Sequence, residues 1–179
     1  VAGPEVQTHR LFHAAEDMEL PRLFVINRMD REHASFGHTV EALRKAFGRT
    51  VTPIAFPIGE GVAFKGVVDL VNSKAWAFVD DESGKFSEFT MPADLEEAAN
   101  HFRQELVEVV AETDEGLMAE FFDKGTLSPQ ALAEGLKKAC HRGLIFPTLP
   151  FSSIKNIGAA QLLNAIVAFL PSPADRPDA

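Results

Sequence analysis

The chain has 179 residues, and its 26 acidic and 17 basic side chains give a formal net charge of −9. Because contact with the phosphate backbone needs a clustered basic face, this balance excludes a non-specific nucleic-acid binder, and we expect no direct sequence-specific binding of nucleic acid either. The apolar runs are far too short to span a bilayer, the hydrophobic fraction of 46% excludes wholesale disorder, and the one cysteine, Cys140, excludes an internal disulfide and fits a reducing cytoplasm.

The chain is expected to begin with a helix that starts near Pro4 and ends before Pro21, followed by a strand. The helical spacing of apolar residues predicts a buried stripe made of Leu11, Phe12, Ala15 and Met18. Residues 23–26 are four consecutive apolar residues, a pattern typical of a strand that is buried on both faces of a parallel sheet. These first elements indicate an α/β arrangement.

A second helix and a second strand follow in the same order. The helix ends at Gly48, and its inward face is predicted to contain Val40, Leu43, Ala46 and Phe47. Residues 51–56 are the next strand candidate. Pro53 lies inside this segment and cannot donate a ladder hydrogen bond, so we expect an edge strand or an interruption there.

From about Gly59 the pattern of the sequence changes, and a unit that contains both strands and helices is expected. Its three predicted strands are residues 66–71, 74–79 and 86–90. Its three predicted helices are residues 93–112, 114–122 and 128–140. Ser128 is the expected N-cap of the last of these helices. The chain then returns to a strand at 146–151 and a final helix at 159–170.

The order of these elements is typical of the open half of a doubly wound α/β sheet with an insertion. In such sheets the ligand binds at the carboxyl ends of the strands. Two predicted strands deliver polar residues to that edge, namely residues 27–30 after the first strand and residues 152–153 after the last. We therefore expect a binding site there.

Two short motifs at this edge resemble the loops with which GTPases bind guanine. Residues 27–30 (Asn-Arg-Met-Asp) are similar to the Asn-Lys-x-Asp motif, and residues 152–156 (Ser-Ser-Ile-Lys-Asn) are similar to the companion Ser-Ala-x loop. Together with the segments 20–22, 66–71 and 170–175, in this order, they make the chain resemble bacterial elongation factor G over essentially its whole length.

The resemblance implies part of a P-loop-GTPase-like domain, a doubly wound sheet whose phosphate-loop half is absent. Residues 1–58 and 144–175 would form this part, residues 59–143 an inserted α+β subdomain that the family calls G′, and residues 176–179 a linker. The resemblance also implies a cytoplasmic, monomeric translational GTPase that acts on the ribosome and promotes translocation. GTP and GDP are the expected ligands.

The guanine-binding residues that the resemblance implies are Asn27, Arg28, Met29, Asp30, Ser152, Ser153 and Ile154. Guanine presents an N1–H and an N2 amine side by side, which the two oxygens of Asp30 match, whereas adenine would face them with lone pairs. Asn27 is expected at the O6/N7 edge and the neighbouring loop, and the Ser153 N–H at O6. Arg28 departs from the family's Lys, whose stem lies over the purine. Alternatively, this segment is only a polar turn in which Asp30 caps the next helix.

The sequence contains no phosphate-binding loop of the form Gly-x-x-x-x-Gly-Lys-Ser/Thr. Its only Gly-Lys pair, Gly84-Lys85, is followed by Phe86, and Val79 stands where the first glycine is needed. Phosphoryl transfer needs such a loop and a Mg²⁺ ligand, which in the family lie upstream with both switch regions. We therefore expect that this chain alone does not hydrolyse GTP. It is expected to have no catalytic residue or metal site of its own, with Mg²⁺ bound only through the upstream half.

Four acidic residues on the predicted helix 93–112 lie off its apolar stripe: Glu97, Glu105, Glu108 and Glu112. The resemblance implies that the inserted subdomain docks a ribosomal stalk protein, and an acidic face would complement a basic partner surface. A solvated face is the alternative. Two other hypotheses stay open. The first is an interaction module, in a paralogue or a related ribosome-acting GTPase, for which nucleotide is irrelevant. The second is an unrelated α/β enzyme whose motifs match by accident.

Overall fold

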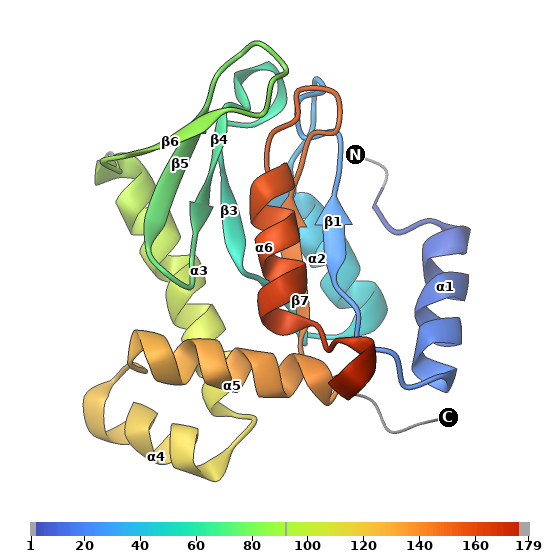
Figure 1. Cartoon of the computed structure of the whole chain (residues 1–179), viewed down its shortest axis with the longest axis vertical. Helices are drawn as coiled ribbons and strands as arrows, with labels where there is room; N and C mark the ends of the chain where they lie inside the picture. The colour runs from blue at the N-terminus through green and yellow to red at the C-terminus, as the bar shows by residue number, and fades with distance from the viewer. Residues whose placement is uncertain (1–2, 92, 176–179) are drawn as a thin grey trace.

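The computed structural model describes residues 3–91 and 93–175 of the chain (Figure 1). Its helices are α1 (Val6–Asp17), α2 (Phe36–Phe47), α3 (Ala93–Ala111), α4 (Glu115–Lys124), α5 (Pro129–His141) and α6 (Ala159–Phe169), with 3-10 helices η1 (Gly61–Ala63) and η2 (Pro173–Asp175). Its strands are β1 (Phe24–Ile26), β2 (Val51–Pro53), β3 (Ala55–Ile58), β4 (Gly66–Asp69), β5 (Lys74–Phe78), β6 (Phe86–Phe89) and β7 (Phe146–Pro150). The linker expected at residues 176–179 lies outside the described residues.

The first sheet is parallel and contains three strands in the order β1-β7-β2. β7 is central, with Leu149 opposite Val25 and Pro147 opposite Thr52. Helix α6 covers one face of this sheet and α2 the other (Figure 1). The side chains of β7 alternate accordingly, since Phe146 packs in the cluster shared with α1 and α2, and Leu149 in the cluster shared with α5 and α6. The predicted α/β fold with a small parallel sheet is confirmed.

β1 is an edge strand, and the expectation that residues 23–26 are buried on both faces is wrong, because Leu23 and Phe24 are only partly buried and Val25 is exposed. In the described part of the chain β1 pairs only with β7, and Val25 is 37% exposed while Ile26 is buried. A continuous apolar run is typical of a strand with covered faces, but it does not tell whether the strand has one neighbour or two.

The extended segment that contains β2 and β3 passes from one sheet to the other at Ile54. β2 is the second edge of the parallel sheet and ends at Pro53, which confirms the predicted edge or interruption. The Ile54 N–H still donates to the Thr148 carbonyl at 3.1 Å, while the Ile54 carbonyl accepts from the Leu70 N–H at 3.0 Å. The single strand expected here is therefore two, because β3 pairs with β4 of the inserted unit.

The second sheet is antiparallel, with the order β3-β4-β5-β6, and it confirms the predicted hairpin and third strand. Asp69 shapes the β4–β5 turn, because its Oδ1 accepts from the N–H groups of Val71 at 2.9 Å and Asn72 at 3.0 Å. Helix α3 is tied to the same turn by Arg103, whose Nη1 donates to the carbonyl oxygens of Leu70 and Val71. In the inserted unit, α3 is thus hydrogen-bonded to the antiparallel sheet through Arg103.

Helices α4 and α5 complete the inserted unit, and local capping explains where they begin. Asp114 Oδ1 accepts from the Gly116 N–H at 2.9 Å, and Ser128 Oγ accepts from the Ala131 N–H at 3.2 Å. Ser128 is therefore the N-cap that the sequence predicts. Cys140 is buried on α5, and burial raises the pKa of its thiol to about 12, so it packs as an apolar residue.

Helix α1 contacts the rest of the chain through a narrow stripe. Phe12 is 8% exposed and stacks on Phe47 with 4.3 Å between the ring centroids. Leu11 and Met18 are 61% and 58% exposed, so their predicted burial is wrong. These side chains are exposed because α1 lies beside the edge strand β1 (Figure 1), where only one face of the helix can pack on the rest of the chain.

Candidate functional site

The loops that follow β1 and β7 lie side by side at one end of the parallel sheet (Figure 1). Their backbones are joined, since the Phe151 N–H donates to the Ile26 carbonyl at 2.9 Å and the Met29 N–H donates to the Phe151 carbonyl at 3.1 Å. The structure therefore brings residues 27–30 and 152–154 together, as expected for the carboxyl ends of adjacent parallel strands.

Asn27 ties the two loops to each other with its side-chain amide. Its Oδ1 accepts from the Arg28 N–H at 2.7 Å and from the Ser153 N–H at 3.1 Å, and its Nδ2 donates to Ser153 Oγ at 3.2 Å. The opposite amide orientation would place NH₂ donors against two backbone donors, so this network selects one orientation. The side chain that the sequence predicts at the guanine edge thus holds the loops of the site together.

Asp30 is joined to the second motif by Ser152. The fully buried Ser152 donates from Oγ to Asp30 Oδ1 at 2.6 Å and accepts from the Lys155 N–H at 3.1 Å. A tight turn holds it, because Ser152 and Ile157 exchange two backbone hydrogen bonds of 3.0 and 3.1 Å. A carboxylate has about four acceptor positions, so this one bond orients Asp30 and leaves positions for further donors.

The other predicted site residues lie in different environments. Met29 is 1% exposed and belongs to a core cluster, so its side chain anchors the first loop and does not face a ligand. Arg28 is exposed and has a left-handed backbone with φ of 64°. Ile154 is 59% exposed on the second loop. The two loops therefore expose Arg28 and Ile154 to solvent.

The backbone N–H of Ser153, expected to donate to guanine O6, donates to Asn27 Oδ1 in this structure. A guanine O6 at this place has to share that N–H with Asn27 or take it over. The Ser153 side chain is also engaged, through its Oγ with Asn27 Nδ2.

Helix α2 begins at Phe36 and is capped by Ser35, whose side chain accepts from the His38 N–H at 3.5 Å. Glu60, at the start of the inserted unit, accepts from the Phe36 N–H at 2.7 Å. The alternative in which Asp30 caps the following helix is therefore wrong. Asp30 belongs to the loop before this helix and bonds across to the second motif.

Two of the four acidic residues singled out on α3 are engaged within the chain. Glu105 Oε2 lies 3.0 Å from Arg44 Nη2 of α2, and both side chains are partly buried. Glu112 Oε1 lies 3.0 Å from Arg49 Nη2, which follows α2. These pairs hold α3 against the α2 side of the molecule.

The other two acidic residues form no ion pair within the described part of the chain. Glu97 is exposed, and Glu108 is partly buried and accepts from Gln104 Nε2 of the same helix at 3.3 Å. The partner-binding role of the four residues stays a prediction, and Glu97 and Glu108 are the members whose carboxylates are not engaged in one of these ion pairs.

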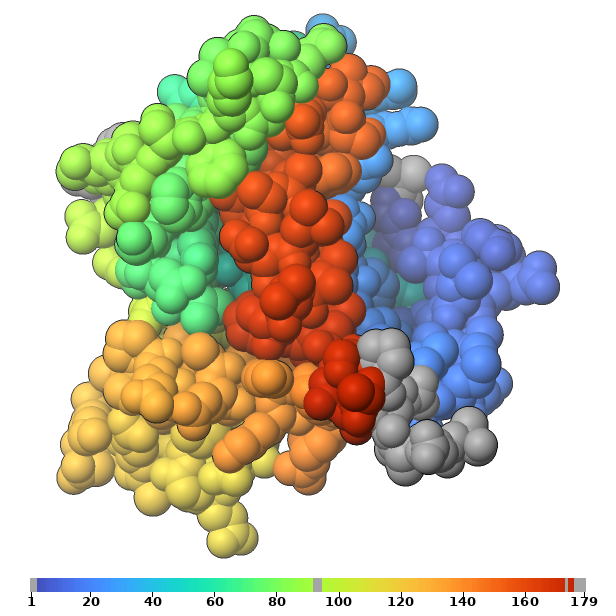
Figure 2. All heavy atoms as spheres, in the orientation of Figure 1, coloured from blue at the N-terminus to red at the C-terminus, as the bar shows by residue number. Residues whose placement is uncertain are grey.

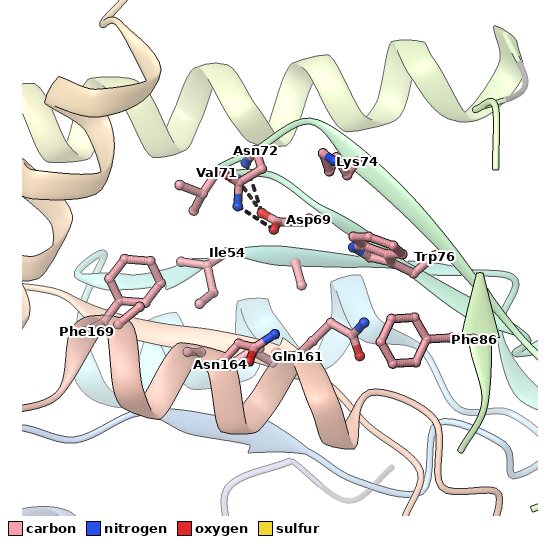
Figure 3. A pocket seen from close by; sticks show the side chains of 14 residues that line it. Ile54, Asp69, Val71, Asn72, Lys74, Trp76, Phe86, Gln161, Asn164 and Phe169 are labelled. Carbon is pink, nitrogen blue, oxygen red and sulfur yellow. Dashed lines mark hydrogen bonds between the residues drawn. The ribbon is translucent and has the colours of Figure 1, made fainter. Parts of the chain in front are cut away.

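A cavity of about 450 Å³ lies between the antiparallel sheet and α6 (Figure 3). Trp76 and Phe86 line one end and Phe169 the other, with Gln161 of α6 between them. The Asp69 carboxylate beside it is engaged in the hydrogen bonds of the β4–β5 turn (Figure 3). Among the described residues, none of those predicted to bind guanine lines this cavity.

The described residues contain no group of three or more His, Cys, Asp or Glu side chains that could hold a metal ion. Nor does any helix in the described ranges have the length and apolar character that crossing a membrane requires. Binding of Mg²⁺ through an upstream segment stays a prediction.

A contact between the inserted unit and the second loop could not be predicted from the sequence. Lys155 Nζ lies 3.2 Å from Asp80 Oδ1, and Gly84 packs so closely on Asn156 that an added Cβ would clash with the Asn156 side chain. Gly84, with φ of 71°, marks a hairpin tip in an acidic turn. A glycine within an acidic turn is a sequence signal that predicts the hairpin tip, but it does not predict which residues the tip contacts.

Comparison with known proteins agrees with this geometry. Residues 1–172 match the family model described as the elongation factor Tu GTP binding domain. The fold matches a crystal structure of a protein from Thermus thermophilus with a TM-score of 0.86 and 34% sequence identity, over 98% of this chain and 26% of that one. The chain therefore belongs to the family of elongation factor Tu GTP-binding domains, which are guanine-nucleotide-binding domains of translational GTPases.

Proposed function

We propose that the chain recognises the guanine base in a translational GTPase of the elongation factor G type. The observation that carries this proposal is the Asp30 carboxylate, oriented by Ser152 next to the Ser153 backbone on adjacent loops. The N1–H and N2 amine of guanine are a pair of donors for one carboxylate, and adenine offers no such pair. Because Asn27 already fastens the loops, less ordering is needed on binding.

Each predicted site residue receives a role in this proposal. Asp30 accepts from the base, and Ser153 donates its N–H to O6 by sharing it with Asn27. Arg28 is exposed on the first loop, from which its guanidinium can stack on the purine, as the family's Lys does with its stem. Ser152 and Met29 hold the loops, and Ile154 lines the exposed edge.

The phosphates and Mg²⁺ are proposed to be bound by a segment outside these 179 residues. The support is the sequence, which has no Gly-x-x-x-x-Gly-Lys-Ser/Thr loop. The chain by itself then binds GDP through the base alone, with weak affinity, and does not turn over GTP. This arrangement also agrees with the 26% share of the solved Thermus protein that the chain spans.

Within the family we propose the elongation factor G type, a cytoplasmic monomer that promotes translocation on the ribosome. The support is the sequence of the segments 66–71 and 170–175, together with an inserted unit between the two base loops. This unit is proposed as residues 59–143, flanked by 1–58 and 144–175. β3, which precedes this unit in the chain, hydrogen-bonds with β4 of the unit.

A second proposed role is docking of a ribosomal stalk protein on α3, alone or together with nucleotide binding. The observation that favours it is that Glu97 and Glu108 form no ion pair within the described residues, whereas Glu105 and Glu112 pair with Arg44 and Arg49. A basic partner surface would complement these carboxylates.

The test of base recognition is an NMR titration of the ¹⁵N-labelled chain with GDP, IDP and ADP. We expect GDP to shift the amides of residues 27–30 and Ser153 in a saturable way. IDP, which lacks the N2 amine, should bind more weakly, and ADP should cause no saturable shift at these amides. Equal responses to GDP and ADP, or none to either, would contradict the proposal.

A further inference from the structure

The tip of the β5–β6 hairpin, residues 79–85, has a defined shape of its own. The Val79 N–H donates to the Lys85 carbonyl at 2.9 Å and closes the tip. Within it, Asp81 Oδ1 accepts from the Ser83 N–H at 3.0 Å, and Ser83 Oγ accepts from the Lys85 N–H at 3.2 Å. These hydrogen bonds give the tip a fixed conformation, so it can hold a neighbouring segment in place.

This tip rests on the loop that follows β7, as the contact between the light green and orange atoms in Figure 2 shows. The Lys155 ammonium pairs with Asp80 at 3.2 Å, and the Lys155 side chain is 28% exposed. The backbone of Gly84 packs directly on the side chain of Asn156. One contact is an ion pair and the other is steric, so the two can be changed separately.

The two contacted residues adjoin the groups that orient Asp30. The Lys155 N–H donates to Ser152 Oγ, and Ser152 Oγ donates to Asp30 Oδ1. Asn156, with φ of 53°, directly precedes Ile157, which closes the turn with Ser152. A displacement of Lys155 or Asn156 therefore reaches the Asp30 carboxylate through two hydrogen bonds.

We propose that Lys155 and Asn156 are positioning residues for base recognition, held in place by the hairpin tip through Asp80 and Gly84. The inference rests on the proposed function, in which Asp30 is the group that accepts from guanine. It makes the inserted unit part of the base site, so that a movement of the hairpin changes the affinity for guanine nucleotide.

The steric contact is tested with Gly84→Ala and a matched control, Gly125→Ala. Both glycines have nearly the same positive φ, 71° and 69°, but a Cβ at Gly125 meets nothing within 4 Å. Gly84→Ala should weaken GDP binding about fivefold by pushing Asn156 aside, and Gly125→Ala should leave it unchanged. Adding Asn156→Gly to Gly84→Ala removes the clash and should restore part of the affinity.

The ionic contact is tested with a double-mutant cycle of Asp80→Ala and Lys155→Ala. Each single change should weaken GDP binding about twofold to threefold, and the double change should cost no more than either alone. Glu88→Ala is the control, because it removes an ion pair with Lys74 on the same hairpin without touching the second loop.

The readouts are the GDP dissociation constant from NMR titration and the amide exchange rates of Ser153 and Lys155 without nucleotide. We expect Gly84→Ala and Asp80→Ala to weaken GDP and to speed exchange at both amides, with the controls unchanged. If the wild-type chain binds GDP and the variants bind it as the controls do, the positioning role is wrong and base recognition stands. If the wild-type chain does not bind GDP, base recognition and the positioning role both fail.

Discussion

Ser152 Oγ and Asp30 Oδ1 are 2.6 Å apart, although 122 residues separate them in the sequence. This is the short range of a hydroxyl bonded to a carboxylate. Because Ser152 also accepts from the Lys155 N–H, its own hydrogen is directed at Asp30. One buried hydroxyl thus couples the two loops that we propose to bind guanine.

Replacing Ser152 with alanine should therefore affect both stability and binding. Ser152→Ala leaves the Lys155 N–H and Asp30 without this partner, so the free energy of unfolding should fall by about 1–3 kcal/mol. GDP binding should weaken as well, because Asp30 loses its orientation. Urea denaturation and NMR titration measure the two effects. Ser153→Ala is the control, since it keeps the backbone N–H, and equal effects from the two substitutions would refute the role of Ser152.

A second prediction concerns Arg22, whose guanidinium carbon lies 4.1 Å from the ring centroid of Phe12 and 4.6 Å from that of Phe146. Burial lowers the pKa of Arg22, against the opposing effect of Glu16. Arg22→Met should lower the free energy of unfolding by about 1–2 kcal/mol, because the two cation–π contacts are lost. Arg22→Lys should fall in between, since it keeps the charge but not the planar group. Equal denaturation midpoints for the wild type, Arg22→Met and Arg22→Lys would show that the stacking of Arg22 contributes nothing to stability.

The proposed docking of a stalk protein is tested on Glu97 and Glu108 of α3. The double variant Glu97→Lys, Glu108→Lys should slow association with a basic stalk-protein domain and flatten its salt dependence, because screening acts over about 8 Å at physiological ionic strength. Glu115→Lys on α4 is the control. Glu105 is left unchanged, since its loss would break the pair with Arg44. An unaltered salt dependence in the double variant means that this face is only solvated.

Cys140 predicts a pH dependence of stability. Burial raises the pKa of its thiol from the ordinary 9.0 to about 12, so the folded chain keeps a proton that the unfolded chain loses. The contribution is fully present below about pH 9 and is lost as the pH rises from about 9 towards 12. Denaturation of the wild type and Cys140→Ala at about pH 8 and pH 10 isolates this effect, because the other groups cancel. The wild type should lose more stability than the variant, and parallel losses would contradict the assignment.

Much of the fold could be predicted because its signals are local. The cap at Ser128, the β4–β5 turn and the helical spacing in α3 depend on neighbouring residues, and they appear where the sequence predicts them. The edge position of β1 and the change of sheet at Ile54 depend on which distant strands are available, and no local pattern carries that information.

The candidate site could likewise be predicted only in part. The meeting of Asn27, Asp30, Ser152 and Ser153 could be predicted, because parallel strands bring their carboxyl ends to one edge of a sheet. The pairing of Glu105 with Arg44 and the contact of Gly84 with Asn156 could not, since both depend on how the inserted unit packs against the rest of the chain.

The central claim, that Asp30 reads the guanine base, is tested most directly by exchanging the base that it prefers. Xanthine has a carbonyl where guanine has its N2 amine, so the amide of Asp30→Asn can donate to that carbonyl while its oxygen accepts from N1–H. We predict that the wild-type chain binds GDP in preference to XDP and that Asp30→Asn reverses this order in competition titrations. If the variant keeps its GDP preference within about threefold, a change of only ~0.65 kcal/mol, Asp30 does not read the base.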